Sequence, residues 1–495
     1  MTFRRLVYSV LIIIVSLVGA TGCDDRQEEG LPPVVSFTGS KVIRIALGES
    51  RLLSPSFDHL TDRAVIRWIL DGTVVGSARE YTFSPAESGV YYLTVEVSTE
   101  WGSDADELRF EVYEDTPEPE PVLPSDRTPA CFPQHTYNVS EGRTIRILPF
   151  DLDSTLDLRC VWMLGDTVMQ DSDDPLYRFE ARQQGVFDLT FQLRHDGAVI
   201  FADTVQVNVC PPEGTYRRPA GAASSPYAAC VHEFLPAPGQ YVNENYTALT
   251  MEEACAYAFS RICAEQYVSL GGFGGSLVVG FDHSIDNDGD YSFAIRSALT
   301  ANGSEPGIVW VMQDENGNGL PDDTWYEVKG SEYGLEGTVQ DYAVTYYRPS
   351  GPALPVVWTD NRGGSGRVEY MAAFHKQDSY YPLWVEEERY TLRGTRLETR
   401  NYDSSGTGTM WVLPDRDWGY ADNHSDLDML PERAAGITAG CNHFKISDAV
   451  TFDGQPARLQ YIDFIKVQTG LNGNSGWLGE ISTEVAGFID FNMVK

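Results

Sequence analysis

Residues 314–323, with the sequence DENGNGLPDD, combine residue types and spacing that can bind a metal ion. Side chains with oxygen atoms alternate along this stretch, and glycine follows the third of them. The alternation turns successive oxygens toward one point, and the glycine permits the sharp turn that a calcium loop needs. The predicted calcium ligands are Asp314, Asn316, Asn318, Leu320, Asp322 and Asp323.

This stretch departs from the usual calcium loop at its end. Trp325 occupies the twelfth position, where a glutamate normally closes the coordination shell. Asp322 and Asp323, at the ninth and tenth positions, are the predicted replacements. Hard oxygen donors without a nearby histidine or cysteine favour calcium over transition metals. The alternative is an Asn/Gly/Asp-rich hairpin that binds no ion.

A second acidic cluster has less regular spacing, so we interpret it as a solvated turn and leave open whether it binds an ion. Its members are Asp282, Asp286, Asn287, Asp288 and Asp290.

Aromatic residues in the C-terminal half are the candidate ligand-binding residues. Aromatic rings stack on sugars or flat cofactors and supply much of the binding energy. The candidates are Trp325, Trp384, Trp418 and Tyr420. The alternative for each of them is a place in the hydrophobic core.

Motifs of common hydrolases and nucleotide-binding enzymes are missing from the sequence. The chain has no HExxH, no Gly-x-Ser-x-Gly, no P-loop and no dinucleotide fingerprint. We therefore predict that the protein is not an enzyme. A polysaccharide-cleaving enzyme with a carboxylate pair is the less favoured alternative, because Asp and Glu are abundant.

The elements that must position these residues belong to a C-terminal domain over residues 227–495. Thr250 and Glu253 form a capping box that predicts one helix over residues 252–264. Strands are predicted at residues 277–281, 307–311, 342–347 and 461–467. Many strands with glycine-rich turns predict a jelly-roll β-sandwich.

An internal repeat precedes this domain. Each copy has a Trp-x-Leu strand, a Tyr-x-Phe strand, and a glycine six residues after that Phe and two before an aromatic residue. Such duplication with period-two alternation predicts two small antiparallel sandwiches, residues 33–113 and 127–210. Acidic, proline-rich residues 114–126 and Pro/Gly/Ala/Ser-rich residues 211–226 are the predicted linkers. The whole chain is thus predicted to be all-β with one short helix.

The N-terminus has the pattern of a targeting segment. Two arginines precede an apolar run that is too short to cross a membrane, which predicts a signal peptide over residues 1–22. Small residues before Cys23 resemble the lipobox of bacterial lipoproteins, which implies lipidation at that thiol. Acidic residues 23–32 form a tether that resembles a surface-export signal of Gram-negative lipoproteins. We therefore expect an outer-membrane lipoprotein exposed at the cell surface.

The composition restricts the classes of molecule that the chain can bind. The formal net charge is −36, which repels phosphate backbones and excludes nucleic acid as a favourable partner. Hydrophobic residues make up 42% of the chain, which indicates folded domains rather than an acidic disordered protein. Seven cysteines remain besides Cys23, so at least one is not paired within the chain, and the sequence leaves any pairing open.

Both parts of the chain resemble known bacterial surface modules. The two repeats are similar to PKD-like immunoglobulin-type domains. Residues 231–490 resemble a recurrent domain of PKD-containing cell-surface lipoproteins of Gram-negative gut anaerobes. The segments that carry this second resemblance are residues 236–243, 268–283, 305–307, 314–326, 419–423, 462–467 and 479–484.

The resemblance implies a binding protein. Similar surface lipoproteins serve TonB-dependent uptake of nutrients such as cobalamin or glycans. We therefore expect a calcium-stabilised β-sandwich that presents a ligand to a TonB-dependent transporter. The alternative is an adhesin or structural surface protein whose C-terminal domain binds another protein.

Overall fold

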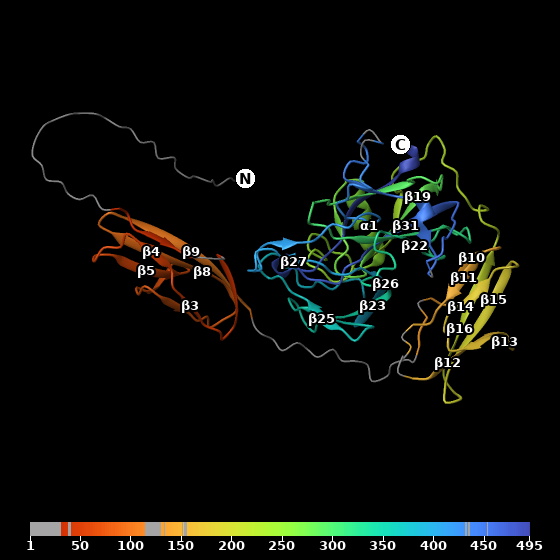
Figure 1. Ribbon diagram of the computed structural model, residues 1–495, viewed down its shortest axis with the longest axis horizontal. Coiled ribbons are helices and arrows are strands. Elements are labelled where there is room, and N and C mark those ends of the chain that lie inside the picture. The colour runs from red at the N-terminus through yellow and green to blue at the C-terminus, as the bar shows by residue number, and fades with distance from the viewer. Residues whose placement is uncertain are drawn as a thin grey trace, which may run out of the picture. The chain divides into compact units, whose positions relative to one another are not determined.

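A computed structural model of the chain describes residues 31–37, 41–113, 130–132, 134–150, 152, 156–430, 433, 436–452 and 454–495 (Figure 1). The chain divides into two compact units, Met1–Thr116 and Pro117–Lys495. The predicted signal peptide, Cys23, the linker over residues 114–126 and all but the last two residues of the tether lie outside the described ranges. Within the described ranges, no helix is long and apolar enough to cross a membrane.

The first unit contains one β-sandwich. Its main sheet has the order β2 (Val42–Ala46), β9 (Gly102–Tyr113), β8 (Gly89–Thr99), β5 (Val65–Leu70), β6 (Thr73–Gly76). Two short pairs pack on the same core, β1 (Val34–Ser36) with β4 (Ser56–Asp58) and β3 (Arg51–Leu53) with β7 (Tyr81–Phe83). Trp68 is fully buried, stacks on Tyr81 at 5.3 Å and donates its indole N–H to the carbonyl of Ala78.

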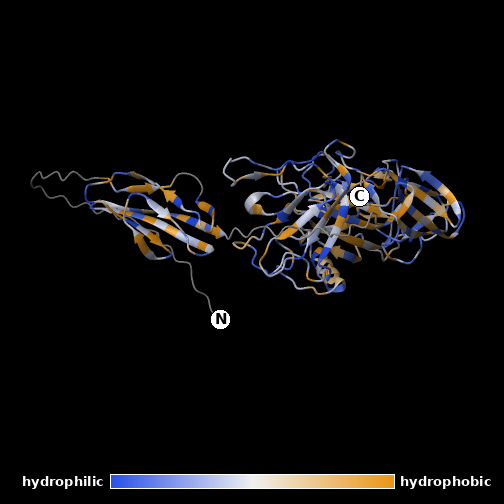
Figure 2. Cartoon of the chain, turned by 90° about the horizontal axis from the view of Figure 1, so that it is seen from below, coloured by the Kyte–Doolittle hydropathy of each residue, from blue (hydrophilic) through white to orange (hydrophobic). Residues whose placement is uncertain are grey.

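The second sandwich repeats the order of this main sheet and one of its two short pairs. Its main sheet has the order β10 (Thr136–Ser140), β16 (Ala198–Cys210), β15 (Gly185–His195), β12 (Leu158–Leu164), β13 (Thr167–Ser172). The pair β11 (Thr144–Ile147) and β14 (Tyr177–Glu180) packs on its core. In both sandwiches one edge strand of the main sheet pairs in parallel with its neighbour, β2 with β9 and β10 with β16. Trp162 stacks on Tyr177 at 5.3 Å, as Trp68 stacks on Tyr81. Figure 2 shows the alternating hydropathy along the strands that sequence periodicity predicted.

Eight strands of the C-terminal domain form a jelly roll. One sheet has the order β18 (Val268–Ser269), β32 (Glu484–Asp490), β20 (Phe293–Ser297), β29 (Cys441–Phe444). The other has the order β19 (Ser276–Asp286), β31 (Tyr461–Thr469), β21 (Gly307–Met312), β22 (Tyr326–Val328), with β17 (Cys230–Leu235) and β30 (Ala449–Val450) at its edges. Numbered along the chain, the eight strands pair as 1-8-3-6 and 2-7-4-5, which is the jelly-roll order.

A long insertion separates β22 from β29. It contains a third sheet in the order β25 (Ser365–Val368), β24 (Val356–Asp360), β23 (Val339–Tyr347), β26 (Arg389–Arg396), and a small hairpin of β27 (Tyr402–Asp403) and β28 (Trp411–Val412). The strand predicted at residues 342–347 belongs to this inserted sheet and not to the jelly roll. Alternation along a strand indicates which face is buried, but it carries no information on which sheet the strand joins.

The predicted helix is α1 (Met251–Cys263). The hydroxyl of Thr250 accepts the N–H of Glu253 at 3.2 Å, and the Glu253 carboxylate accepts the N–H of Leu249 at 2.7 Å. Ala254, Ala258 and Ile262 form the buried face of the helix, at the spacing of an amphipathic helix.

Removing the cap should measurably destabilise the C-terminal domain. For Thr250→Ala in the chain over residues 24–495 (the truncated chain), we expect a loss of about 1 kcal/mol in the free energy of unfolding, because an orphan N–H loses its acceptor. Urea unfolding followed by circular dichroism measures this loss. Thr247→Ala, at an exposed position outside the helix, is the control, and equal losses in the two variants would contradict the capping role.

Candidate functional site

The predicted calcium loop connects β21 to β22 and is organised around Asp314. The Asp314 side chain is 4% exposed, and its two oxygens accept N–H groups from Gly317, Asn318 and Gly319 at 2.8–3.1 Å. The side-chain amides of Asn316 and Asn318 donate to the two Asp322 carboxylate oxygens at 3.0 and 2.9 Å. The structure therefore gathers Asp314, Asn316, Asn318 and Asp322 in one tight loop. Their oxygen chemistry suits calcium.

Two buried carboxylates of this loop lack full hydrogen bonding. Glu315 and Asp323 are 3% and 2% exposed, and each has one carboxylate oxygen without a hydrogen-bond partner in the described residues. Burial raises the pKa of Glu315 to about 7 and that of Asp323 to about 8. Sequence reasoning assigned Asp323 to the calcium shell, and here one of its oxygens accepts the N–H of Glu315 at 3.0 Å.

The loop also joins the second sandwich to the jelly roll. The N–H of Ser140 donates to Glu315, the Asn138 side chain donates to the carbonyl of Asp322, and Thr324 donates to the carbonyl of Asn138.

Residues 211–226, predicted to be a linker, also pack on the C-terminal domain. In this segment Glu213 binds Gln313 and Gln460, and Arg218 binds Asp463. The second sandwich is therefore part of the same compact unit as the jelly roll.

Three other carboxylates from distant parts of the chain meet in the C-terminal domain. Glu305 precedes β21, Asp422 lies in the insertion, and Glu484 begins β32. One oxygen of each lies within 4.8 Å of the others, the only such group of three His, Cys, Asp or Glu side chains found in the described part of the chain. Asp422 is buried, whereas Glu305 and Glu484 are half-buried, so the cluster reaches solvent. Oxygen donors at this spacing suit Ca²⁺ or Mg²⁺. We call this group the carboxylate triad.

Backbone contacts hold the triad in place. The N–H of Glu484 donates to the Asp422 carboxylate at 2.8 Å, and the N–H of Glu305 donates to the Asp422 carbonyl at 2.9 Å. The hydroxyl of Thr483 donates to the Glu305 carbonyl at 2.8 Å. Asp422 adopts a left-handed backbone with φ of 52°, which is uncommon for a residue other than glycine and costs free energy. The fold thus places the Asp422 side chain at a specific, strained position.

A positive charge would stabilise the clustered carboxylates of the triad, and no described side chain supplies one. Burial and the charges of Glu484 and Asp422 raise the pKa of Glu305 well above its usual range, and burial also raises the pKa of Asp422 and Glu484. Ionised carboxylates this close together repel one another, so Glu305 retains its proton to higher pH than an isolated glutamate. No described lysine or arginine forms an ion pair with the triad. Other acidic side chains do have such partners: Glu213 with Arg143, Asp463 with Arg218, and Glu332 with Arg416.

A fourth carboxylate, Glu480, is coupled to this site. It is 5% exposed; one oxygen accepts the N–H of Gln240 at 2.8 Å, and the other has no partner in the described residues. Burial, with a smaller contribution from the charge of Glu484, raises the pKa of Glu480 to about 8. The charge of Glu480 in turn raises the pKa of Glu305. A buried carboxylate oxygen without a donor beside three clustered acids indicates a place for a cation.

Exposed aromatic rings lie on segments that adjoin Glu480: Tyr241 follows Gln240, whose N–H donates to Glu480, and Trp477 lies three residues before Glu480. Tyr241 packs edge-on against His375 with ring centroids 4.9 Å apart, and Phe374, which precedes His375, lies 6.3 Å from Trp477. Tyr241, Phe374 and Trp477 are 43%, 48% and 44% exposed. Partial burial and the charges of Glu484, Glu480 and Glu305 raise the pKa of Tyr241 to about 12. We call Tyr241, Phe374, His375 and Trp477 the aromatic strip.

The four aromatic residues proposed from sequence lie elsewhere. Trp384 and Tyr420 are 8% and 2% exposed and belong to hydrophobic cores, so neither offers a ring face to a ligand. Trp325 is half-buried beneath the Lys466 ammonium, 4.7 Å from its ring, and Trp418 is half-buried. Aromatics in irregular segments look exposed in sequence, but the insertion folds two of these into cores.

A signal for the observed site was present in the sequence. Glu305, Asp422 and Glu484 each lie in a segment that carries the family resemblance, as do Tyr241 and Glu480. Sequence reasoning did not connect these three carboxylates with one another.

The acidic cluster over residues 282–290 contains neutralised side chains. Three of its members pair with basic side chains at 2.5–2.6 Å: Asp286 with Arg217, Asp288 with Lys495, and Asp290 with Arg433. These ion pairs already neutralise the carboxylates of the turn, which agrees with its interpretation as a solvated turn.

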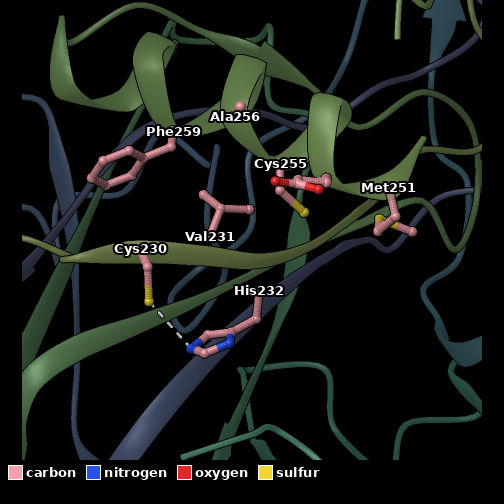
Figure 3. A pocket seen from close by; sticks show the side chains of 8 residues that line it. Cys230, Val231, His232, Met251, Cys255, Ala256 and Phe259 are labelled. Atoms are coloured by element: carbon pink, nitrogen blue, oxygen red, sulfur yellow. Dashed lines mark hydrogen bonds between the residues drawn. The ribbon is translucent and has the colours of Figure 1, made fainter. Parts of the chain in front are cut away.

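A groove of about 460 Å³ lies between β17 and α1 (Figure 3). Cys230 and His232, neighbours on one face of β17, approach at 3.2 Å between Sγ and Nε2. Burial raises the pKa of the Cys230 thiol and lowers the pKa of His232. The pair is therefore neutral and lacks the ionised thiolate that a cysteine nucleophile needs. The described cysteines form no disulfide with one another.

Comparison with known proteins identifies no family for this chain. No protein-family model matches it, and no curated protein matches it. Among solved structures, the fibronectin(III)-like modules of Clostridium thermocellum CbhA share 13% identity over 36% of this chain and 93% of that chain, with a TM-score of 0.15. The tandem immunoglobulin domains of titin share 15% identity over 36% of this chain and 97% of that chain, with a TM-score of 0.14. At such scores, the assignment of β-sandwiches rests on the sheet orders of the structure itself.

Proposed function

We propose that this chain is a non-enzymatic lipoprotein of the outer cell surface whose C-terminal jelly roll binds a divalent cation and, through it, a ligand. Immunoglobulin-like β-sandwiches are modules of surface and adhesion proteins, and this chain carries two. The predicted lipid at Cys23 would anchor the chain in the outer membrane. The resemblance to surface lipoproteins suggests delivery of a glycan or cobalamin-like nutrient to a TonB-dependent transporter.

The carboxylate triad, which has no basic partner among the described residues, is the observation that carries this proposal. Three clustered carboxylates ionise together only with a positive charge nearby. A divalent cation would supply that charge and displace the protons that the triad otherwise retains. Ca²⁺ takes six to eight oxygen ligands, so three carboxylates leave coordination positions open on the half-buried side. Those positions would accept oxygens from a ligand.

Binding fits the triad better than glycoside cleavage. The two carboxyl groups of a retaining glycosidase stand about 5–5.5 Å apart and flank the bond that they cleave. Here three carboxylates, rather than a facing pair, bring oxygens within 4.8 Å of one another, as the ligands of a single cation do. A cation clamp needs this close contact.

The loop over residues 314–323 would serve as a second, structural calcium site. Its organised oxygens and its contacts with Asn138 and Ser140 support a role in holding the second sandwich against the jelly roll.

The alternative function is that of an adhesin that contacts another protein, and the same surface-type sandwiches support it. It predicts capture of a protein partner and no cation-dependent binding of a small molecule.

Calorimetric titration of the metal-free truncated chain with Ca²⁺ tests the proposal. We expect the double variant Asp422→Asn/Glu484→Gln to bind one Ca²⁺ fewer than the parent chain, because it loses two carboxylates of the triad. Glu327→Gln is the matched control, since Glu327 is also buried with its pKa raised to about 7 but lies outside the triad. An unchanged number of bound Ca²⁺ ions in a folded double variant would refute the cation site.

A further inference from the structure

We infer that the ligand of this site is a neutral glycan, whose adjacent hydroxyl groups bind the cation on the triad while its sugar rings stack on the aromatic strip. This inference rests on the proposed cation site and specifies the class of ligand. It combines two features that lie side by side, a group of oxygen donors and a set of exposed rings.

The aromatic strip has the features of a sugar platform. Exposed aromatic rings pack well against the C–H faces of sugars, whereas scattered single rings on a surface need no explanation. Tyr241 and His375 contact one another, as do Phe374 and Trp477, and Phe374 and His375 are neighbours in the chain. The Trp477 indole N–H donates to the carbonyl of Thr409 at 3.3 Å, which fixes the ring while 44% of the residue stays exposed.

Backbone and side-chain contacts tie the strip to the triad. The Gln240 side chain donates to the carbonyl of Leu478, next to Trp477, and the Gln240 N–H donates to Glu480. Tyr241 follows Gln240 in the chain, and Glu480 lies four residues before Glu484 of the triad. A ligand that covers Tyr241 would thus lie within reach of a cation on the triad.

The negative charge of the site and of the whole chain favours an uncharged ligand over an anionic one. Three carboxylates and one divalent cation leave a net negative charge, and Glu480 adds to it when ionised. The whole chain carries a net charge of −36. Phosphate- or sulfate-bearing ligands would be repelled, whereas the hydroxyl oxygens of a sugar are neutral, hard donors that suit Ca²⁺. Adjacent sugar hydroxyl groups can fill two open coordination positions of one Ca²⁺ ion, which favours a glycan.

The first experiment screens the truncated chain on an array of plant, fungal and mucin glycans, in Ca²⁺ and in EDTA. We expect binding to a subset of neutral glycans in Ca²⁺ and loss of that binding in EDTA. The best glycan is then tested after periodate oxidation, which cleaves bonds between adjacent hydroxyl-bearing carbons. Oxidised glycan should no longer bind.

Variants of the strip complete the test. Trp477→Ala and Phe374→Ala should each weaken glycan binding about fivefold without changing the number of bound Ca²⁺ ions, because a stacked ring contributes about 1 kcal/mol. Phe452→Ala is the matched control, since Phe452 and Phe374 are both 48% exposed.

The outcomes separate the two proposals. Normal Ca²⁺ binding without retention on any glycan of the array would overturn the glycan inference and leave the cation site standing. Calcium-dependent binding of cobalamin alone would do the same. Loss of no Ca²⁺ ion in the triad double variant would overturn the proposed function itself.

Discussion

In EDTA, the melting temperature of the truncated chain should fall by roughly 10 °C as the pH rises from about 5 to about 9. The cause is a set of buried carboxyl groups whose pKa values are raised in the folded protein. Burial raises the pKa of Glu315 to about 7, and those of Glu480 and Asp323 to about 8. In the unfolded chain, these groups ionise near pH 4.

The sign follows from the protons bound in each state. Below about pH 4 both states hold the proton, so these groups contribute nothing to the pH dependence. Between about pH 4 and pH 8 the unfolded chain loses protons that the folded chain retains, so the free energy of unfolding falls as the pH rises. Each pKa unit is worth about 1.4 kcal/mol, so a shift like that of Glu480 amounts to several kcal/mol.

Calcium should suppress this fall, because a bound cation stabilises the ionised carboxylates. Differential scanning calorimetry at several pH values, with Ca²⁺ and with EDTA, measures both curves. The Ca²⁺ curve should be nearly flat over the same range. Parallel curves in the two conditions would contradict cation binding at these carboxylates, and a melting temperature that rises with pH in EDTA would contradict their raised pKa values.

Asp314→Ala should have the second large effect, a loss of about 3 kcal/mol or more in the free energy of unfolding. The Asp314 carboxylate is nearly buried and accepts three backbone N–H groups of its loop. Alanine would remove the acceptor of the Gly317 and Gly319 N–H groups, whereas the Asn318 N–H keeps the Asn316 side-chain oxygen. Each hydrogen bond to a charged group contributes about 1.5–3 kcal/mol. The loop also carries the contacts of Asn138 and Ser140, so the second sandwich should detach more readily.

Thermal unfolding with and without EDTA measures the first part of this prediction, and limited proteolysis of residues 211–226 measures the second. EDTA should lower the melting temperature of the parent chain, and part of that difference should disappear in Asp314→Ala. Asp403→Ala is the matched control. Its carboxylate also accepts loop N–H groups, from Ser405, Gly408 and Met410, but in an exposed hairpin. Equal sensitivity to EDTA in both variants would contradict a calcium site at Asp314.

The local elements of this protein follow from short-range pattern. The Thr250–Glu253 capping box and the apolar spacing after it predict α1 to within one residue at each end. The matched spacing around Trp68 and Trp162 predicts two sandwiches, and their sheets do share one strand order. Both features depend on residues that are neighbours in the chain or on one strand, so the sequence carries the information directly.

The candidate site depends on contacts over long distances in the chain. Glu305, Asp422 and Glu484 meet because β32 pairs between β18 and β20 and because the insertion returns to the start of β21. None of the three lies in a recognisable ligand spacing, so no local motif reveals them. The same folding buries Trp384 and Tyr420, which sequence reasoning placed at the surface.

The sequence by itself determined the all-β class, the tandem sandwiches, the single helix and the calcium-type loop, because alternation, capping and loop spacing are local properties. It also supplied the expectation of an anchor at Cys23, which lies outside the described residues. The tertiary structure decided that the second sandwich docks on the calcium-type loop, and that four acidic side chains gather beside an exposed aromatic strip. Those arrangements arise from strand pairing between distant segments, and burial then gives the gathered carboxylates their raised pKa values.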